Sequence, residues 1–262
     1  MILAGVLGDP IGHSRSPALH GHWLKRHGID GAYVPLHVRG HDLEETLRLL
    51  PRVGFAGCNV TIPHKAAALA LADQATDRAR AIGAANTLTF RDGAIHADNT
   101  DGAGFLANLR AGSDWAPDRP AVVLGAGGAA RGVVAALAEA GVPEIRISNR
   151  TRAKADALAD AFPRTVTSDG LADAGLLVNT TSLGMTGQPP LETDLADLPR
   201  DAVVTDIVYV PLLTPLLKRA AARGNPTVDG LGMLLHQAAT GFAAWFGVTP
   251  VVDDDLRRAV TG

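Results

Sequence analysis

Short apolar runs rich in β-branched residues alternate along most of the chain with stretches rich in alanine and leucine. The apolar runs predict strands, because branched side chains pack well on a pleated surface. The stretches between them predict helices. Such alternation is typical of an α/β fold whose strands are mainly parallel. The expected strands cover residues 2–8, 32–38, 57–61, 121–126, 144–149, 175–180 and 202–208.

Two of the predicted helices follow from clear local patterns, and the second of them raises a question about function. Apolar residues recur at helical spacing from Thr227 to Gly247 and predict one long helix. The alanines and leucines that follow Pro63 predict a short helix that begins at about Lys65. A helix carries the positive pole of its macrodipole at its amino end, so a cation there is mildly unfavourable. Lys65 therefore calls for a functional explanation.

The chain is long enough for more than one domain. Its 262 residues are 47% hydrophobic, which suffices for one large or two modest domains with their own cores. Proline, aspartate and glycine interrupt the pattern at residues 112–120, just before a new strand and a glycine-rich loop, and favour a domain boundary there. The first apolar run stops at Asp9 and Pro10, and no apolar window of about 18 residues follows. We therefore expect a cytoplasmic protein.

Charge and composition favour a small-molecule partner. The formal net charge is −3, and the 24 Lys and Arg residues are scattered, which argues against nucleic acid. The single cysteine, Cys58, excludes an internal disulfide. His20 and His22 would point about 200° apart on a helix, which suits a metal ion poorly. We interpret both histidines as ordinary polar positions and expect no metal site.

A glycine-rich loop begins at Gly125, at the end of the strand predicted at 121–126. It has the G-x-G-x-x-G/A spacing of dinucleotide-binding folds, between a strand and a helix as that motif requires. Gly125 would make the turn, Gly127 would let the backbone approach a pyrophosphate, and Ala130 would pack the helix on the strand. The amino end of the helix would receive the anion. The alternative, a tight turn without a ligand, is weakened by the flanking strand and helix.

The next strand ends in Asn149, Arg150 and Thr151, where NAD-binding folds usually carry an acidic residue. A carboxylate there would repel the 2′-phosphate of NADP, whereas an arginine pairs with it. The sequence therefore predicts NADP rather than NAD, with Lys154 as a second cation. The alternative is that Arg150 is a solvated surface arginine.

Polar side chains gather at predicted strand ends before the glycine loop. They are Ser14, Ser16, Asn59, Thr61, Lys65, Asn86, Thr87 and the run Asp98 to Gly102. Hydroxyl and amide groups in such positions suit a polyhydroxylated substrate. Each has a structural alternative, with Ser16 as a helix cap, Asn86 as a turn residue and Asp101 as a helix start. Their concentration in front of a dinucleotide-binding half favours a substrate site.

Ketone reduction would explain Lys65. Hydride transfer to a ketone develops negative charge on the carbonyl oxygen, and a nearby ammonium stabilises that charge and delivers the proton. A carboxylate such as that of Asp101 would keep the lysine charged and hold it in place.

The chain contains, in this order, the segments GDPIGHSRSP, NVTIPHK, GAANT, DNTDG, GAGGAARG, NRT, NTTSLGM, DIVYVPLLTPLL and DGLGMLLHQAATGF. Taken together, these segments resemble the shikimate dehydrogenases, which are NADP-dependent enzymes of aromatic amino-acid biosynthesis. The resemblance implies reversible reduction of 3-dehydroshikimate to shikimate by NADPH in a cleft between two α/β domains. It implies a substrate domain at 1–102, with a mainly parallel sheet and joined by the C-terminal helices 237–262, and a Rossmann-type NADP-binding domain at 103–236.

The resemblance also implies a role for individual residues. Lys65 and Asp101 match the catalytic pair of the family. The positions that hold the substrate carboxylate or line the rest of its pocket are Ser14, Ser16, Thr61, Asn86, Tyr209 and Gln237. The cofactor positions are Asp77, Gly125, Ala126, Gly127, Gly128, Ala129, Asn149, Arg150, Thr151, Lys154, Ile207, Gly230 and Met233.

Two of these positions have a further qualification. The family often has an arginine where Lys154 stands, so this chain keeps the positive charge and loses the planar guanidinium. Tyr209 has an alternative interpretation as a packing aromatic.

Two other functions compete with this prediction. A quinate/shikimate dehydrogenase would accept an additional hydroxyl group and NAD, and Asn149 with Arg150 weighs against NAD. A non-catalytic NADP-binding sensor would share the fold, but the presence of Lys65 and Asp101 weighs against it. The motifs fit a monomer and a homodimer equally well.

Overall fold

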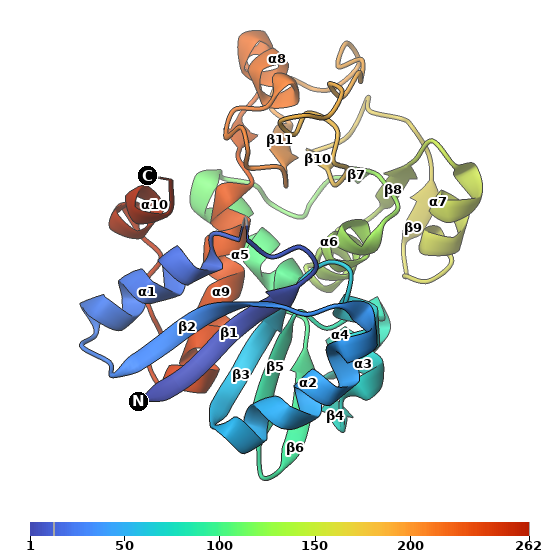
Figure 1. The fold of residues 1–262 in the computed structure, drawn as a ribbon. Helices are drawn as coiled ribbons and strands as arrows, with labels where there is room; N and C mark the ends of the chain where they lie inside the picture. Colours follow the sequence, from blue (N-terminus) through green and yellow to red (C-terminus); the bar gives the residue numbers. More distant parts are fainter. Residues whose placement is uncertain (13, 262) are drawn as a thin grey trace. The chain divides into compact units, whose positions relative to one another are not determined.

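The computed structural model describes residues 1–12 and 14–261. The chain divides into two compact units, Met1–Thr100 with Leu235–Gly262, and Asp101–Leu234. Each unit has its own sheet with helices packed on it, so the predicted α/β fold class is confirmed (Figure 1). Among the described residues, no helix has the length and apolar character needed to cross a membrane.

The first unit is built on a mixed six-stranded sheet in the order β2-β1-β3-β5-β6-β4. β1 pairs in parallel with β2 and β3, and β4 with β6, whereas β5 is antiparallel to both β3 and β6. The three strands predicted in this part of the chain are confirmed as β1, β2 and β3. The strands are β1 Ile2–Gly8, β2 Gly31–His37, β3 Phe55–Val60, β4 Gln74–Ala75, β5 Thr87–Arg91 and β6 Ala94–Asp98.

Helices cover both faces of this sheet (Figure 1). On one face, Leu43 and Leu47 of α2 pack against Leu7, Cys58 and Leu88 of the strands. The other face carries α1 and the second half of α9. The helical segments of this unit are α1 Ser16–Arg26, η1 Gly40–Asp42, α2 Leu43–Leu49, η2 Leu50–Val53, α3 Lys65–Leu71, α4 Asp77–Ile82, α9 Leu231–Phe246, which begins in the other unit, and α10 Asp254–Thr261.

An aromatic cluster forms the core between the sheet and the helices α1 and α9. Trp23 lies edge-on to Phe242, with ring centroids 5.2 Å apart. His20 is fully buried in the same cluster and stacks on Tyr33 at 3.8 Å with an interplanar angle of 4°. The interpretation of His20 as an ordinary polar position was therefore wrong. Helix α1 turns this side chain onto the sheet, where the aromatic rings exclude water from it.

The second unit has an all-parallel sheet in the order β12-β11-β10-β7-β8-β9. The order reverses beside β7, and ligands of open α/β sheets bind at the carboxyl ends of the strands at such a switch point. The strands are β7 Ala121–Leu124, β8 Ile145–Ser148, β9 Thr165–Thr167, β10 Leu176–Asn179, β11 Val203–Asp206 and β12 Thr227–Val228. The four strands predicted here are confirmed as β7, β8, β10 and β11.

Alternate residues of these strands face two different cores. Val123 and Val178 pack with α5 and α6 on one face. Val122 and Leu177 pack with α8 on the other. Both faces are therefore buried, which explains why the strands read as continuous apolar runs. The helices are α5 Asp101–Gly112, α6 Gly128–Glu139, α7 Arg152–Ala159 and α8 Pro215–Arg223.

Two predicted boundaries differ from the structure. The stretch 112–120 joins α5 to β7 inside the second unit. The long helix predicted from Thr227 begins only at Leu231, because Thr227 and Val228 pair with β11 as strand β12. Asp229 ends the strand, and its Oδ1 accepts a hydrogen bond of 3.0 Å from the amide of Leu231 at the start of α9.

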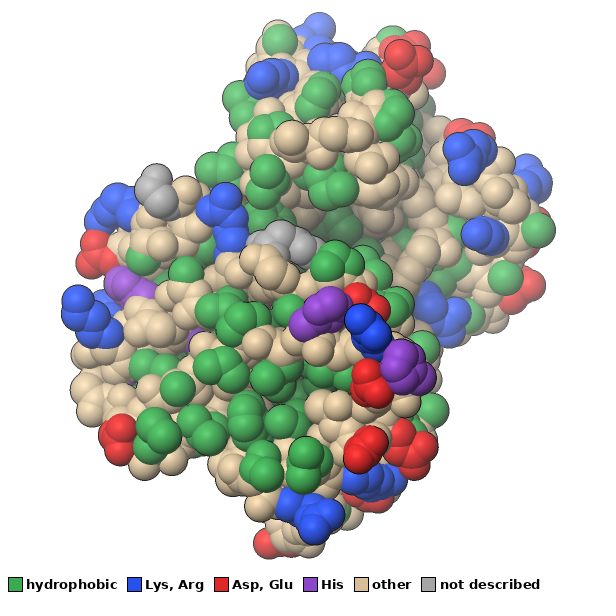
Figure 2. All heavy atoms as spheres, viewed as in Figure 1, with side chains coloured by type: hydrophobic (Ala, Val, Ile, Leu, Met, Phe, Trp, Pro, Cys, Tyr) green, Lys and Arg blue, Asp and Glu red, His purple; other side chains and the backbone are tan. Residues whose placement is uncertain are grey.

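Charged side chains of both signs are interspersed on the face shown in Figure 2. Several cations of the first unit are paired. Arg48 lies 3.1 Å from Asp73, and Arg26 lies 2.5 Å from Asp253. On that face Lys and Arg form no broad patch of the kind that binds nucleic acid.

Candidate functional site

The glycine turn at the end of β7 has the geometry that the motif requires. Gly125 has a φ of 108°, and a β-carbon at this position would lie 2.7 Å from Oγ1 of Thr180. A side chain would therefore suffer both backbone strain and a clash. The amide of Gly125 donates to the carbonyl of Ser148 at 2.8 Å. The turn is thus held against the ends of β8 and β10, at the switch point of the sheet.

The next residues leave open space at the start of α6. A β-carbon on Gly127 or Gly128 would meet no atom within 4 Å. Helix α6 begins at Gly128, and Ala130 in its first turn is fully buried against the core. Ala126 is partly buried against that core, and Ala129 is half-buried. An open loop followed by a helix amino end, with free N–H groups, fits the pyrophosphate of a dinucleotide.

The end of β8 presents positive charge and no carboxylate. Asn149 is half-buried, and its amide donates to the carbonyl of Thr151 at 2.8 Å, which fixes the loop before α7. Arg150 and Lys154 are exposed, and residues 148–154 include no acidic side chain. The exposure of Arg150 also agrees with the alternative that it is only a solvated surface arginine. Its position beside the glycine turn fits recognition of a 2′-phosphate.

Three more of the predicted cofactor residues come together beyond β11. A β-carbon on Gly230 would lie 2.5 Å from the carbonyl carbon of Ile207, so only glycine permits this approach of two backbones. Ile207 and Met233 both pack against the core under the sheet. The amide of Ile207 donates to the carbonyl of Asn179 at 3.1 Å. Tyr209 is half-buried in the same segment.

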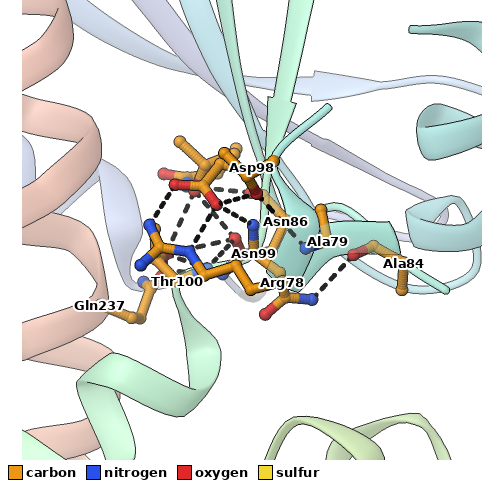
Figure 3. A network of polar contacts seen from close by, with 11 residues as sticks. Arg78, Ala79, Ala84, Asn86, Asp98, Asn99, Thr100 and Gln237 are labelled. Atoms are coloured by element: carbon orange, nitrogen blue, oxygen red, sulfur yellow. Dashed lines mark hydrogen bonds and ion pairs between the residues drawn. The ribbon is translucent and has the colours of Figure 1, made fainter. Parts of the chain in front are cut away.

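Two of the predicted substrate residues of the first unit, Asn86 and Gln237, belong to a buried polar network (Figure 3). Asn86 is 2% exposed, and its Nδ2 donates to Oγ1 of Thr100 at 3.1 Å and to Oε1 of Gln237 at 3.2 Å. Its Oδ1 accepts from the amide of Thr100 at 2.9 Å. The structure therefore brings together Asn86 and Gln237, which are 151 residues apart in the sequence.

The network continues towards the aromatic cluster. Asn59 donates to the carbonyl of Asn86 at 3.1 Å and to Oγ1 of Thr87 at 3.2 Å. Its Oδ1 accepts from the hydroxyl of Tyr33 at 2.7 Å. A buried network with its partners in place is rigid, because breaking one bond leaves another group unsatisfied in a low-dielectric interior. The side chains next to this network are thus held in fixed positions.

Asp98 forms the other edge of the network in Figure 3. Burial raises its pKa, but hydrogen bonds from Arg78 and Thr76 outweigh that effect and leave the pKa below its usual value. The carboxylate is consequently ionised and engaged. Asp77, a predicted cofactor residue, lies between Thr76 and Arg78 in the sequence, in the exposed first turn of α4.

The two predicted carboxylate-binding serines are neighbours. Ser16 is 6% exposed and is the first residue of α1, and its amide lies 3.3 Å from Oγ of Ser14. Arg15 is the N-cap residue of the helix, so the alternative that Ser16 caps it is wrong.

Lys65 is the first residue of α3, as predicted, and it is half-buried. Its carbonyl accepts a bond of 2.9 Å from the amide of Ala85, next to Asn86. The amide of His64 donates to the carbonyl of Thr61 at 2.9 Å. Main-chain bonds thus connect the segments that carry Thr61, Lys65 and Asn86.

Asp101 belongs to the second unit and is the first residue of α5. A β-carbon on Gly132 of α6 would lie 3.8 Å from Cβ of Asp101, so the aspartate starts the helix beside α6. The alternative that Asp101 begins a helix therefore holds, and it does not conflict with a catalytic role. Because Lys65 lies in the other unit, the pairing of the two side chains stays a prediction.

Comparison with known proteins identifies the family. Family models match residues 6–88 as a shikimate dehydrogenase substrate binding domain, 110–182 as shikimate / quinate 5-dehydrogenase and 230–256 as a shikimate 5′-dehydrogenase C-terminal domain. A shikimate dehydrogenase (NADP(+)) from Dinoroseobacter shibae is 63% identical, over 98% of this chain and 96% of its own. The chain belongs to the shikimate dehydrogenase family.

Solved structures of the shikimate dehydrogenase family have the same fold. The enzyme from Thermus thermophilus, in complex with NADP(H) and shikimate, is 38% identical with a TM-score of 0.92, over 100% of this chain and 99% of that one. A quinate dehydrogenase from Corynebacterium glutamicum in complex with NAD is 33% identical, also with a TM-score of 0.92, over 99% and 98%. The fold alone therefore does not separate the two substrates or the two cofactors.

The structure adds site residues to which the sequence analysis gave no individual role. Thr100 is fully buried at the centre of the Asn86 network, within the segment DNTDG that matches the shikimate dehydrogenases. Asp206 is fully buried at the end of β11. The available signal was a charged residue inside a predicted strand. Among residues 1–12 and 14–261, no group of three or more His, Cys, Asp or Glu side chains is placed to bind a metal ion.

Proposed function

We propose that the protein catalyses the NADPH-dependent, reversible reduction of 3-dehydroshikimate to shikimate, a step of chorismate and aromatic amino-acid biosynthesis. The observation that carries the proposal is 63% identity, over 98% of the chain, to a protein named shikimate dehydrogenase (NADP(+)). The geometry of both units agrees with it. The cytoplasmic location and the monomeric or homodimeric state are also part of the proposal.

The second unit fits NADP(H), which would supply the hydride when bound. The turn from Gly125 to Ala129 and the amino end of α6 would hold the pyrophosphate, because a β-carbon on Gly127 or Gly128 would meet only open space. Arg150 and Lys154 would pair with the 2′-phosphate. Ile207, Gly230 and Met233 would complete the cofactor site, together with Asn149, Thr151 and Asp77.

The first unit would orient the substrate. Ser14 and Ser16 would bind its carboxylate with hydroxyl hydrogen bonds, which favour geometry over charge attraction. Asn86 and Gln237, fixed by their mutual bond, would contact the ring hydroxyls with Thr61. Tyr209 would add a phenol to the same pocket.

Lys65 would act on the carbonyl oxygen that gains negative charge during reduction. Its ammonium would stabilise the charge and deliver the proton, and Asp101 would keep it charged and in position. In the reverse direction, Lys65 would accept the proton of the shikimate hydroxyl.

The test is the initial rate of nicotinamide absorbance change with the purified protein. Shikimate and quinate are each supplied with NADP and with NAD, at equal concentrations. Turnover that is fast only with shikimate and NADP supports the proposal. Faster turnover with quinate or with NAD would contradict the substrate or the cofactor assignment. No turnover with either acid, despite NADP binding, would favour a non-catalytic sensor.

A further inference from the structure

A buried carboxylate ends strand β11. Asp206 is fully buried, and the three strand residues before it, Val203, Val204 and Thr205, are buried as well. An ionised group in such surroundings is stable only with hydrogen bonds that replace its water. Asp206 has three of them. Its Oδ1 accepts from Nδ2 of Asn179 at 2.9 Å and from the amide of Val208 at 3.0 Å, and its Oδ2 accepts from Oγ1 of Thr214 at 2.8 Å.

The three donors lie on three different segments. Asn179 ends β10, Val208 follows β11, and Thr214 is the N-cap residue of α8, where its hydroxyl accepts from the amide of Leu217 at 3.3 Å. We call the side chains of Asp206, Asn179 and Thr214 the Asp206 clamp. It joins the carboxyl ends of two neighbouring strands to the start of the next helix.

Asn179 extends the clamp into the loop after β10. Its Oδ1 accepts from the amide and the hydroxyl of Thr181 at 2.9 and 2.8 Å, and its Nδ2 also donates to the carbonyl of Leu183 at 3.1 Å. The amide of Thr186 donates to the carbonyl of Val210 at 2.9 Å, which ties this loop to the one after β11. One carboxylate therefore organises the loops 180–186 and 207–214.

Both loops adjoin the proposed cofactor and substrate positions. Thr180 donates to the carbonyl of Leu124 through its amide and its hydroxyl, at 2.9 and 2.7 Å, and so lies against the Gly125 turn. The other loop carries Ile207 and Tyr209. Both loops leave the sheet at its carboxyl edge, where α/β folds bind their ligands.

We propose that Asp206 is a positioning residue for the reaction, which through Asn179 and Thr214 holds the loop with Ile207 and Tyr209 to the loop 180–186, and that loop lies against the Gly125 turn. This inference rests on the proposed function. A carboxylate is suited to the task because it accepts all three bonds, whereas an asparagine would direct an NH₂ group at one of the donors. Burial raises the pKa of Asp206 and the three bonds oppose that effect. The chain therefore keeps a costly group at this position.

The main test is Asp206→Asn. Displacement of the loop should lower kcat/KM for shikimate by about 10–100-fold, mostly through kcat. The Kd of NADP, measured by fluorescence titration, should change by a smaller factor than kcat, because the proposed phosphate contacts lie on other loops and only Ile207 of the proposed cofactor residues lies on the displaced loop.

The matched control is Asn225→Ala, in the same unit. Asn225 is 5% exposed and donates to the carbonyls of Pro199 and Ala202 at 2.8 and 3.0 Å, at the amino end of β11. This variant loses comparable buried bonds away from the two loops, so it should lower the melting temperature and retain kcat. An equal loss of kcat in both variants would mean that Asp206 is merely structural, and would overturn the inference.

Thr214 provides a second variant in case Asp206→Asn does not fold. Thr214→Val removes one donor of the clamp and should also lower kcat, whereas Thr214→Ser keeps the hydroxyl and should restore it. If Asp206→Asn folds, wild-type rates in both this variant and Thr214→Val would refute the proposal. If Asp206→Asn does not fold, wild-type rates in Thr214→Val would refute it.

Hydrogen exchange separates this inference from the proposed function. Asp206→Asn, or Thr214→Val in its place, should speed amide exchange in 180–186 and 207–214 relative to the rest of the second unit, whatever the substrate is. If the wild-type protein fails to oxidise shikimate, the proposed function is wrong and exchange alone decides whether the clamp exists. Unchanged exchange in both loops would overturn the clamp even in an active enzyme.

Discussion

Acidification should destabilise the protein through one buried histidine. His20 is fully buried between aromatic rings, and within the described part of the chain neither of its ring nitrogens has a hydrogen-bond partner. Burial lowers the pKa of His20 from 6.5 to about 3, although the side chain of Asn59 opposes the shift. The atom of Asn59 that can accept a bond from the imidazolium is Oδ1, which already accepts from the hydroxyl of Tyr33 at 2.7 Å, and burial is the larger of the two effects.

The sign and the size follow from proton linkage. Between pH 6.5 and pH 3, the histidine binds a proton in the unfolded chain and not in the folded one. The free energy of unfolding therefore falls as the pH drops below 6.5. From pH 7.5 to pH 5.0 the loss from His20 alone is about 2 kcal/mol, at about 1.4 kcal/mol for each pH unit below 6.5.

Urea unfolding of the wild-type protein and of His20→Phe at both pH values isolates this contribution. Trp23 and Trp245 lie in the same aromatic cluster, so their fluorescence reports its unfolding. Phenylalanine keeps the stacking on Tyr33 and removes two unsatisfied nitrogens, so it should be tolerated at pH 7.5. Groups that titrate in both proteins, such as His236, cancel in the comparison.

The wild-type protein should lose about 2 kcal/mol more than His20→Phe on going to pH 5.0. His41→Gln, which changes a histidine whose side chain is 72% exposed, should behave like the wild type. If His20→Phe shows the same pH dependence as the wild type, the histidine accepts a proton in the folded state and the reasoning fails.

Two further substitutions test the packing of the first unit and the cofactor assignment. Gly57→Ala places a β-carbon 2.0 Å from Nε1 of Trp245 and 2.2 Å from the carbonyl oxygen of Leu88, so it should destabilise by about 1–3 kcal/mol. Gly40→Ala, where nothing lies within 4 Å, is the control, and equal melting temperatures would show that the tryptophan and the neighbouring strand both move without strain. Arg150→Ala should raise KM for NADPH by about 10–100-fold and leave KM for NADH nearly unchanged. Arg152→Ala, at another exposed arginine, should change neither, and an equal effect of Arg150→Ala on both cofactors would remove the 2′-phosphate role.

Regular local patterns made much of the fold predictable from the sequence. The parallel strands β7 and β10 are buried on both faces, and all their residues except Asn179 are apolar, so they appear as continuous apolar runs. The β5–β6 hairpin was missed although its strands alternate apolar and polar residues, a pattern typical of half-buried strands. Its turn consists of Asp92 and Gly93, both with positive φ. An Asp-Gly pair between two strand-like runs is a strong sequence signal for a two-residue hairpin turn, and this signal would have revealed the hairpin.

The rest depends on contacts between distant residues. Nothing near His20 in the sequence indicates that Tyr33 and Phe242 will enclose it. The partners of Asp206 are likewise visible only once β10, β11 and α8 lie together. Among the site residues, the glycine turn was predictable because its geometry is local. The meeting of Asn86 with Gln237 requires the whole unit.

The most direct test of the account is to measure kcat and the Kd of shikimate for Lys65→Ala, with Lys25→Ala as an exposed-lysine control. If Lys65 delivers the proton, kcat should fall by about 10²–10⁴-fold, while the Kd from calorimetry stays largely unchanged. Lys25→Ala should match the wild type in both quantities. An unchanged kcat in Lys65→Ala would remove this lysine from the chemistry and contradict the central claim.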